Sequence, residues 1–267
     1  MNPQFTSFTG TIPGNYDQYM GPLFFEPYAI DLAARVKNTE PKKVLEIACG
    51  TGRVTKHLRE TLPVTTELVA TDLHAGMLAV AKHNLADKNI EFKEADAQSL
   101  PFEDNSFDLV VCQFGYMFMP DKLKAFGETF RVLSKGGKIL FSTWDKLEKN
   151  EASCIVRDVV AENLGKAENY NVPFSMFNTK QIESLLSNAG FKEINISLLT
   201  KQGTGITALE AAKGLLLGTP AFKQITEAGK TAPDRLVLLA QQRLEAVYGK
   251  GIINTEMNAW VCEAKKV

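Results

Sequence analysis

Short apolar runs alternate with helical patterns between Lys43 and Phe141, and this alternation constrains the fold more than any other feature. The strand-like runs cover 44–48, 67–72, 89–94, 107–114 and 138–143, and the helical patterns cover 53–61, 75–85 and 121–133. Strands that alternate with helices form a parallel sheet with helices packed on its faces. The run from Phe107 to Phe114 is almost continuously apolar, which is typical of a central strand buried on both faces. The sequence therefore predicts an open α/β sheet.

The rhythm changes after Trp144. Helical patterns follow at 151–164, 179–188, 208–217 and 234–248, with strand-like runs at 191–199 and 256–264. No internal repeat or low-complexity linker divides the chain, and 267 residues suit one large domain. We expect a single domain over 1–267 with an N-terminal helical lid (1–40), a ligand-binding core (41–143) and a part that shapes the substrate site (144–267).

The charge balance and the cysteine spacing exclude several classes of partner. Thirty Lys and Arg against 31 Asp and Glu give a net charge of -1, so no overall positive field favours nucleic acid or an anionic membrane. The 4 cysteines form no CxxC pair, so neither a zinc site nor another metal site is expected. Neither a signal peptide nor an apolar run of about 18 residues is visible. The expectation is a cytoplasmic protein with a small-molecule partner and no membrane insertion.

A glycine-bearing turn follows the first strand. The strand 44–48 passes directly into Cys49-Gly50-Thr51-Gly52, and a helical pattern follows. Glycines at such a turn let backbone amides approach a ligand closely. Asp72 ends the next strand, where an acid can accept hydrogen bonds from both hydroxyls of a ribose. Thr55 stands where the third glycine of GxGxxG would be, although the turn and Asp72 alone would also fit a nicotinamide dinucleotide.

Further sequence motifs distinguish between the possible nucleoside ligands. The motif blocks are Glu46–Gly52, Ala70–Asp72, Glu94–Phe102, Asn105–Val111 and Arg131–Gly137. In order and separation they resemble the class I S-adenosylmethionine-dependent methyltransferases, particularly the small-molecule branch that includes ubiquinone and menaquinone biosynthesis enzymes. The resemblance implies a Rossmann-like sandwich, with a mostly parallel seven-stranded sheet, an antiparallel last strand and helical insertions. It also implies S-adenosylmethionine as the cofactor, S-adenosylhomocysteine as the product and methyl transfer to a small organic molecule.

The resemblance also implies a donor site. Glu46 and the turn with Gly50 and Gly52 would contact the methionine portion, and Asp72 the ribose hydroxyls. Leu73, Met77, Asp96 and the Ala97 backbone would lie at the adenine, and the backbone carbonyl of Gln113 would accept from the ammonium group. Ala48 would belong to the same cofactor-binding set. Most of these positions fall at the carboxyl ends of expected strands, where open α/β sheets bind their ligands. One crevice could therefore collect them.

Aromatic residues are frequent in the segments expected to close over this crevice, which are 14–27, 114–119 and 143–177. Candidate acceptor-binding residues are Tyr16, Tyr19, Phe114, Tyr116, Met117 and Trp144. They predict an apolar or aromatic acceptor. No catalytic residue is assigned, because a sulfonium is already an activated electrophile and its transfer requires mainly alignment.

Each of these residues also has a purely structural interpretation. Asp72 could cap the following helix, Asp96 could stabilise a turn, and part of the aromatic cluster could be ordinary core. Two other functions stay open at this point. One is a nicotinamide-dependent oxidoreductase on a Rossmann-like fold, and the other is a module that binds S-adenosylmethionine without turnover.

Overall fold

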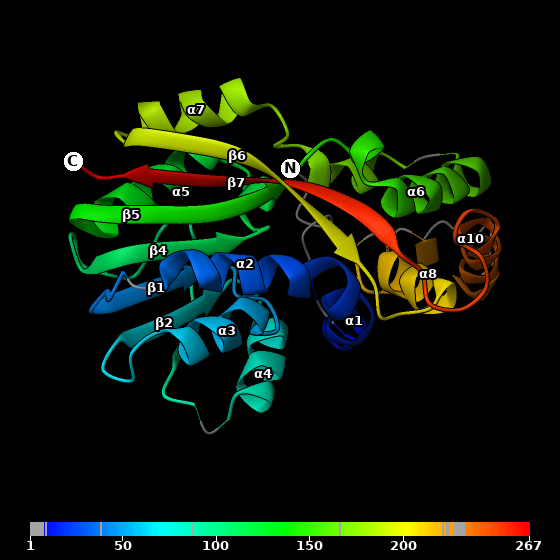
Figure 1. Ribbon diagram of the computed structural model, residues 1–267, viewed down its shortest axis with the longest axis horizontal. Coiled ribbons are helices and arrows are strands. Elements are labelled where there is room, and N and C mark those ends of the chain that lie inside the picture. The colour runs from blue at the N-terminus through cyan, green and yellow to red at the C-terminus, as the bar shows by residue number, and fades with distance from the viewer. Residues whose placement is uncertain are drawn as a thin grey trace.

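A seven-stranded sheet in the order β3-β2-β1-β4-β5-β7-β6 forms the centre of the molecule (Figure 1). The computed structural model describes residues 8, 10–37, 39–86, 88–165, 167–220, 222, 225–226 and 233–267. The strands are β1 (Lys43–Ile47), β2 (Glu67–Asp72), β3 (Glu91–Glu94), β4 (Phe107–Gln113), β5 (Leu133–Trp144), β6 (Lys192–Gly203) and β7 (Thr255–Lys265). The first five pair in parallel, whereas β7 runs antiparallel to both β5 and β6. This arrangement confirms the predicted fold class.

Helices cover both faces of the sheet. The α-helices are α1 (Ile12–Asn15), α2 (Glu26–Val36), α3 (Arg53–Thr61), α4 (Ala75–Asn84), α5 (Lys122–Val132), α6 (Glu151–Leu164), α7 (Thr179–Asn188), α8 (Ala208–Leu217) and α10 (Pro233–Tyr248). Leu32 of α2 and Leu58 of α3 pack with Val44 and Val111 in one buried cluster. Phe126 of α5 lies in a second, larger cluster on the other side. The buried strand β4 therefore lies between two apolar layers, as its continuous apolar run predicts.

Strands β6 and β7 extend beyond the rest of the sheet. In Figure 1 they curve away from it toward α6, α8 and α10, which lie together beside the sheet. Helix α8 begins with a capping box, in which Thr207 and Glu210 bond each other's backbone amides. The second half of the chain thus builds a helical layer next to the carboxyl ends of the parallel strands.

The N-terminal segment enters as α1, a π-helix η2 (Tyr16–Phe25) and then α2. Helix η2 packs against both α2 and α8. A π-helix of 10 residues is unusual, since most are single-turn bulges near functional sites. This segment is part of the region 1–40 that the sequence predicts as a helical lid, of which residues 1–7, 9 and 38 lie outside the described residues. It lies between the sheet and the helical layer.

Strand β5 begins earlier than its sequence pattern suggests. The turn expected at Lys135-Gly136-Gly137 lies inside the strand, where the register against β4 shifts. Gly136 has a φ of +83°, and its amide donates to the Lys266 carbonyl. The glycines therefore form an irregular strand segment instead of a separate turn.

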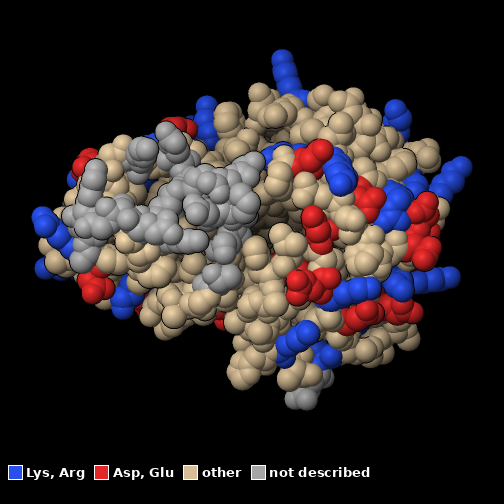
Figure 2. All heavy atoms as spheres, turned by 180° about the vertical axis from the view of Figure 1, so that it is seen from behind, with Lys and Arg blue, Asp and Glu red and all other residues tan. Residues whose placement is uncertain are grey.

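Two observations concern the surface and the cysteines. Figure 2 shows acidic and basic side chains interspersed over the visible face, in keeping with the net charge of -1. All four cysteines are free thiols, and Cys154 alone among them is partly exposed.

Within the described ranges, no helix combines the length and the apolar character needed to cross a bilayer.

Candidate functional site

A crevice opens at the carboxyl ends of β1, β2 and β4, and we call it the donor crevice. It holds about 1160 Å³ of empty space, including its open mouth. The predicted donor residues that line it are Ala48, Gly50, Asp72, Leu73, Met77, Asp96, Ala97 and Gln113. Glu46 lines a smaller space that adjoins it and shares Ala48, Gly50 and Gln113. The fold thus brings together residues that lie up to 67 positions apart between Glu46 and Gln113.

Gly52 lies outside the lining of both spaces. It has a φ of +86° and precedes α3 as its N-cap residue. A Cβ atom there would lie 2.9 Å from Leu85 Cδ1 and 3.2 Å from Ala81 Cβ. Gly52 therefore serves the turn and the close approach of α3 to α4, which is a structural role within the motif.

Asp72 holds the glycine turn in place. Its Oδ2 accepts a 2.9 Å hydrogen bond from the Gly50 amide, and its Oδ1 accepts a 2.9 Å bond from the His74 amide. Burial raises the pKa of the carboxyl, and the hydrogen bonds from His74 and Gly50 oppose that rise. Helix α4 has His74 as its N-cap residue, so Asp72 is not its N-cap. An ionised carboxylate has about four acceptor positions, so both oxygens can still accept from ligand hydroxyls.

Asp96 combines a turn with a place in the crevice. Its Oδ1 accepts from the Gln98 amide at 2.8 Å and from Gln98 Nε2 at 3.2 Å. Gln98 in turn accepts a bond from the Asp121 amide through Oε1. The structural and the ligand-binding interpretations of Asp96 are therefore compatible.

The smaller space contains two buried oxygens without hydrogen-bond partners among the described residues, Glu46 Oε2 and Gln113 Oε1. Burial is the main cause that raises the pKa of Glu46 to about 8. The adjacent Thr55 opposes the rise, and the charge of the nearby Asp72 adds to it. Gln113 Nε2 donates to the Phe25 carbonyl at 3.2 Å, which fixes its amide with the oxygen free. Unpartnered buried acceptors are costly, so they indicate a ligand that donates N–H groups.

These acceptors distinguish two kinds of nucleoside ligand. A pyrophosphate at the glycine turn would lie near the Asp72 carboxylate and would offer no N–H donor to the unpartnered oxygens of Glu46 and Gln113. The methionine portion of S-adenosylmethionine is favoured instead, because its ammonium group can donate to both unpartnered oxygens and its sulfonium is positively charged. The residues present therefore fit S-adenosylmethionine and disfavour a nicotinamide dinucleotide.

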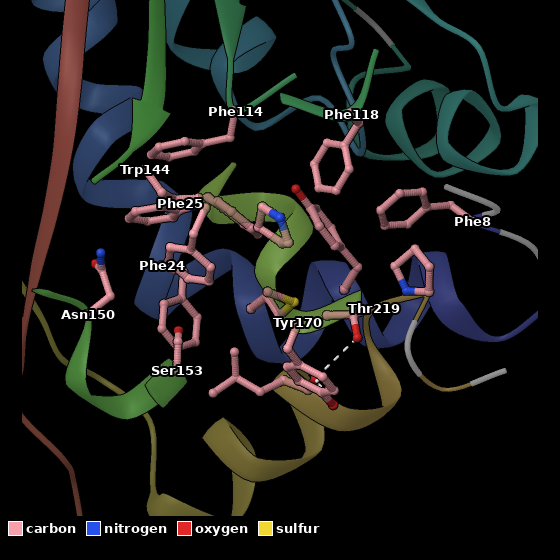
Figure 3. A pocket seen from close by; sticks show the side chains of 16 residues that line it. Phe8, Phe24, Phe25, Phe114, Phe118, Trp144, Asn150, Ser153, Tyr170 and Thr219 are labelled. Carbon is pink, nitrogen blue, oxygen red and sulfur yellow. Dashed lines mark hydrogen bonds between the residues drawn. The ribbon is translucent and has the colours of Figure 1, made fainter. Parts of the chain in front are cut away.

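A second cavity adjoins the donor crevice, and we call it the aromatic cavity (Figure 3). It holds about 840 Å³ of empty space, again including its mouth. Its lining comprises Phe8, Tyr16, Met20, Phe24, Phe25, Phe114, Phe118, Trp144, Asn150, Ser153, Tyr170, Pro173, Phe174, Leu215, Thr219 and Pro220. Phe8, Tyr16, Phe114 and Phe118 line the donor crevice as well. None of these described lining residues is charged.

Aromatic stacking shapes one wall of this cavity. The rings of Phe114 and Trp144 stack with their centroids 3.9 Å apart and their planes at 4°, and Phe25 lies tilted beside both. Figure 3 shows these three rings grouped at one side of the cavity. Tyr28 meets Phe114 and Trp144 edge-on and donates to the Met257 carbonyl at 2.8 Å, which fixes the wall from behind.

Backbone strain accompanies this wall. Phe114 has a φ of +52° and Ala48 a φ of +54°, a region that residues other than glycine rarely adopt. A Cβ on the neighbouring Gly115 would lie 2.7 Å from the Ala48 Cβ, so the ends of β1 and β4 come unusually close. Strained residues of this kind cluster at ligand sites, where the surrounding structure holds them.

The structure divides the predicted acceptor-binding residues into two groups. Tyr16, Phe114 and Trp144 line the aromatic cavity. Tyr116 and Met117 are fully buried, and Tyr116 stacks on Phe126 and shares a 2.7 Å hydrogen bond with Thr129. The ring of Tyr19 lies under the Lys213 ammonium, 5.6 Å away, and outside the lining of the cavity.

Several lining residues were not singled out from the sequence. Phe24, Phe25, Tyr170 and Phe174 all lie in the segments 14–27 and 143–177 that were expected to close over the crevice. The aromatic character of these residues is the sequence feature that could have identified them as lining residues. The contribution of α8 and of Thr219 just beyond it had no such signal, because only the tertiary arrangement brings them to the cavity.

No group of three or more His, Cys, Asp or Glu residues suited to hold a metal ion occurs in the part of the chain that the structure describes.

Tyr16 and Tyr170 are the titratable residues in the described lining of the aromatic cavity, and burial raises the pKa of both phenols. Tyr170 already donates to the Leu215 carbonyl at 3.2 Å. Tyr16 therefore stays protonated near neutral pH.

Together, the strand order and the two joined cavities define an open α/β domain that binds a nucleoside beside a separate apolar site. Residues 45–141 match the family model described as a methyltransferase domain. A UbiE ubiquinone/menaquinone biosynthesis C-methyltransferase from Pectobacterium atrosepticum is 30% identical over 184 residues, which cover 63% of this chain and 72% of that protein. The chain belongs to this family of S-adenosylmethionine-dependent methyltransferases.

Other relatives match a shorter region. A demethylmenaquinone methyltransferase from Thermus thermophilus is 40% identical over 114 residues, or 42% of this chain and 50% of that protein. The chain thus spans about half the length of the curated relatives it matches first.

Solved structures show the same fold at low identity. A phosphoethanolamine N-methyltransferase from Haemonchus contortus with bound S-adenosylmethionine has a TM-score of 0.61 at 20% identity, covering 97% of this chain and 58% of that one. The YcgJ protein of Bacillus subtilis has a TM-score of 0.57 at 17% identity, covering 90% and 98%.

Proposed function

We propose that the protein transfers the methyl group of S-adenosylmethionine to a ring carbon of a small, neutral aromatic acceptor of the quinol type. The observation that carries this proposal is the uncharged aromatic cavity joined directly to the donor crevice. The names of the relatives, which include C-methyltransferases of quinone biosynthesis, support carbon as the methylated atom.

The lining of the aromatic cavity favours a neutral planar acceptor. A phosphate group would lose its hydration there without meeting an opposite charge from the described lining residues. The parallel rings of Phe114 and Trp144 offer a flat apolar wall against which an aromatic ring can pack. Asn150, Ser153 and Thr219 add a few polar groups that could orient ring oxygens.

The reaction needs alignment more than acid–base catalysis. When bound, the cofactor supplies an activated methyl group. A ring carbon next to a phenolic oxygen provides the electron pair for the new C–C bond, and the sulfur keeps the pair of the bond that breaks. The ring carbon then loses its proton to water or buffer, which restores aromaticity. The residues shared by both cavities, such as Tyr16 and Phe114, would hold the ring within attack distance.

Methyl incorporation from labelled S-adenosylmethionine tests the proposal. The acceptors compared are 1,4-dihydroxynaphthalene, phenol and phosphoethanolamine, and NMR of the product identifies the methylated atom. We expect C-methylated dihydroxynaphthalene and no product from phosphoethanolamine. Equal rates on the aromatic and the polar acceptors would refute the proposed acceptor class.

Calorimetry, together with the labelling experiment, tests the other two functions. If S-adenosylhomocysteine binds in calorimetry but no acceptor in the panel or in a metabolite extract becomes labelled, the protein is a binding module. If reduced nicotinamide dinucleotide binds and S-adenosylhomocysteine does not, the protein is a dinucleotide-dependent oxidoreductase.

A further inference from the structure

A cluster of ionic contacts joins the glycine turn of the donor crevice to the π-helix η2. Arg53 is the first residue of α3, directly after Gly52. Its Nη1 donates to Glu26 Oε2 at 2.9 Å, and its Nη2 donates to Asp17 Oδ1 at 3.1 Å and to the Asp17 carbonyl at 3.0 Å. One guanidinium therefore holds both ends of η2, because Asp17 lies near its start and Glu26 directly follows it.

Asp17 contacts the turn itself as well. Thr51 Oγ1 donates to Asp17 Oδ1 at 2.7 Å, and Asn84 Nδ2 donates to Asp17 Oδ2 at 3.3 Å. The Asp17 carboxylate thus connects η2 with the donor turn, with α3 and with the end of α4. The side chains of Arg53 and Asp17 are only 23% and 26% exposed, so solvent screens their charges less than at an open surface.

Glu26 forms the second half of the cluster. His57 Nε2 lies 2.8 Å from Glu26 Oε1, beside the bond from Arg53 to Glu26 Oε2. Burial alone would raise the pKa of Glu26, but the hydrogen bonds from Arg53 and His57 bring it below its usual value. Glu26 is therefore ionised at neutral pH and attracts the guanidinium.

Gly21 shows that the guanidinium has a built place under η2. A Cβ atom at Gly21 would overlap the guanidinium group of Arg53. A side chain at this position would therefore displace the guanidinium, the flexible end of Arg53, from its place under the helix. By contrast, a Cβ at Gly14 of α1 would meet nothing within 4 Å.

The held segment forms part of the aromatic cavity. Tyr16, Met20, Phe24 and Phe25 of η2 all line it, and Tyr16 also lines the donor crevice. Tyr16 stacks on Phe25 with ring centroids 4.8 Å apart. Any change in the position of η2 therefore changes the wall between donor and acceptor.

We propose that Arg53 is a positioning residue that, through Asp17 and Glu26, couples occupation of the donor crevice to the position of η2 and so to the shape of the aromatic cavity. This inference rests on the proposed function. A ligand that orders the glycine turn also orders Thr51 and Arg53, and their contacts transmit that order to η2. Coupling of this kind is reciprocal, so a bound acceptor also strengthens donor binding.

Hydrogen exchange tests the coupling without requiring turnover. In the wild-type protein, saturating S-adenosylhomocysteine should slow amide exchange over residues 16–25 by about tenfold, within the range typical of coupled sites. Gly21→Ala removes the place of the guanidinium but leaves every residue of the donor crevice unchanged. In this variant S-adenosylhomocysteine should still bind in calorimetry, but exchange over 16–25 should stay at its ligand-free rate.

Two further variants complete the experiment. Asp17→Asn removes the charge that attracts Arg53 and should reproduce the Gly21→Ala result, which guards against a folding defect in either variant. Gly14→Ala adds the same methyl group in open space and should behave as wild type. With 1,4-dihydroxynaphthalene as acceptor, Gly21→Ala should raise the acceptor KM about fivefold or more and change the donor KM less.

The outcomes separate the two proposals. Full slowing of exchange in both Gly21→Ala and Asp17→Asn would overturn the role of Arg53 and leave the proposed function intact. Binding of S-adenosylhomocysteine to the wild type without any slowing over 16–25 would do the same. Absence of binding to the wild type would refute the proposed function and the coupling with it.

Discussion

Glu46 illustrates how a single buried acid can control ligand binding. Its side chain is fully buried, its Oε2 has no hydrogen-bond partner in the described part of the chain, and its pKa is raised to about 8. The carboxyl is thus mostly neutral at pH 7 in the free protein. An ammonium group nearby would favour the charged form and lower this pKa again.

Donor binding should therefore release a proton. Between about pH 6 and 7.5 the affinity for S-adenosylhomocysteine should rise about tenfold per pH unit, because binding requires the ionised Glu46. Calorimetry in buffers of different ionisation enthalpy measures the proton release. Glu46→Gln should bind more weakly and show no pH dependence in this range. A wild-type affinity that is constant from pH 6 to 7.5 contradicts this assignment.

The same pKa shift has a consequence for the free protein. The folded state keeps a proton at Glu46 that the unfolded chain loses near its usual value of 4.5. Since the folded state binds more protons over this interval, the contribution of Glu46 to stability falls as the pH rises from 4.5 toward 8. Glu46 thus lowers the stability of the free protein as the pH rises, and the ammonium group of a bound ligand would offset this loss.

Gly52 and Gly136 form a matched pair for separating backbone strain from packing. Both have positive φ, but a Cβ at Gly52 would meet Leu85 and Ala81, whereas a Cβ at Gly136 would meet nothing within 4 Å. Gly136→Ala should cost about 1–2 kcal/mol for the left-handed backbone alone. Gly52→Ala should cost about 1–3 kcal/mol more from overpacking. Urea unfolding measures both, and equal losses would contradict the packing role of Gly52.

At the scale of elements, the helical layer beside the sheet determines the acceptor site. Helix α8 contributes Leu215, and Thr219 follows just beyond its end. Its first turn is stabilised by the capping box of Thr207 and Glu210. Loss of this cap should therefore affect both stability and the aromatic cavity.

Thr207→Ala should lower the free energy of unfolding by about 1 kcal/mol and raise the acceptor KM. Asn178 is the N-cap residue of α7, and its side chain accepts from two backbone amides. Asn178→Ala removes this cap. Because α7 packs against α5 and β6, this control should lose similar stability without a change in acceptor KM. Thermal unfolding and steady-state kinetics measure the two effects. A KM increase of the same size in both variants would show that α8 has no particular role.

For the whole molecule, the fit of the donor crevice to one class of nucleoside should appear as ligand-dependent stability. S-adenosylhomocysteine at about 100 times its Kd should add about 2.7 kcal/mol, which is about 5–10 °C in Tm for a domain of this size. Reduced nicotinamide dinucleotide should give no shift, because its pyrophosphate would lie near the Asp72 carboxylate and has no N–H group for the unpartnered oxygens of Glu46 and Gln113. A larger shift with the dinucleotide would contradict the assignment of the crevice.

The bounds of several helices and strands could be predicted from local sequence patterns. Helix α6 and helix α8 have the bounds that their patterns predict, and β2 does as well. Each of these elements buries a face that its own residues define. The turn at Lys135–Gly137 differed because the pairing of β5 with its neighbours outweighed the local preference of two glycines for a turn.

The convergence of the predicted donor residues on one crevice could be foreseen, because these residues follow directly from the strands that carry them. In a parallel sheet the carboxyl ends of neighbouring strands meet at one edge, so Gly50, Asp72 and Gln113 converge once the strands are known. Aromatic composition was less informative. Phe114 and Tyr116 are two residues apart, yet one lines the cavity and the other stacks on Phe126 in the core.

The sequence by itself determined the order of the elements and the glycine turn with Asp72, since both depend on neighbouring residues or on strand ends. It indicated the class of cofactor through the resemblance of its motif blocks to a known family. Only the tertiary structure decided which aromatic residues face the cavity, that α8 contributes to it, and that Arg53 lies under Gly21. The physical reason is that these features depend on contacts between segments far apart in the chain. Their geometry follows from how whole helices pack, which no local pattern records.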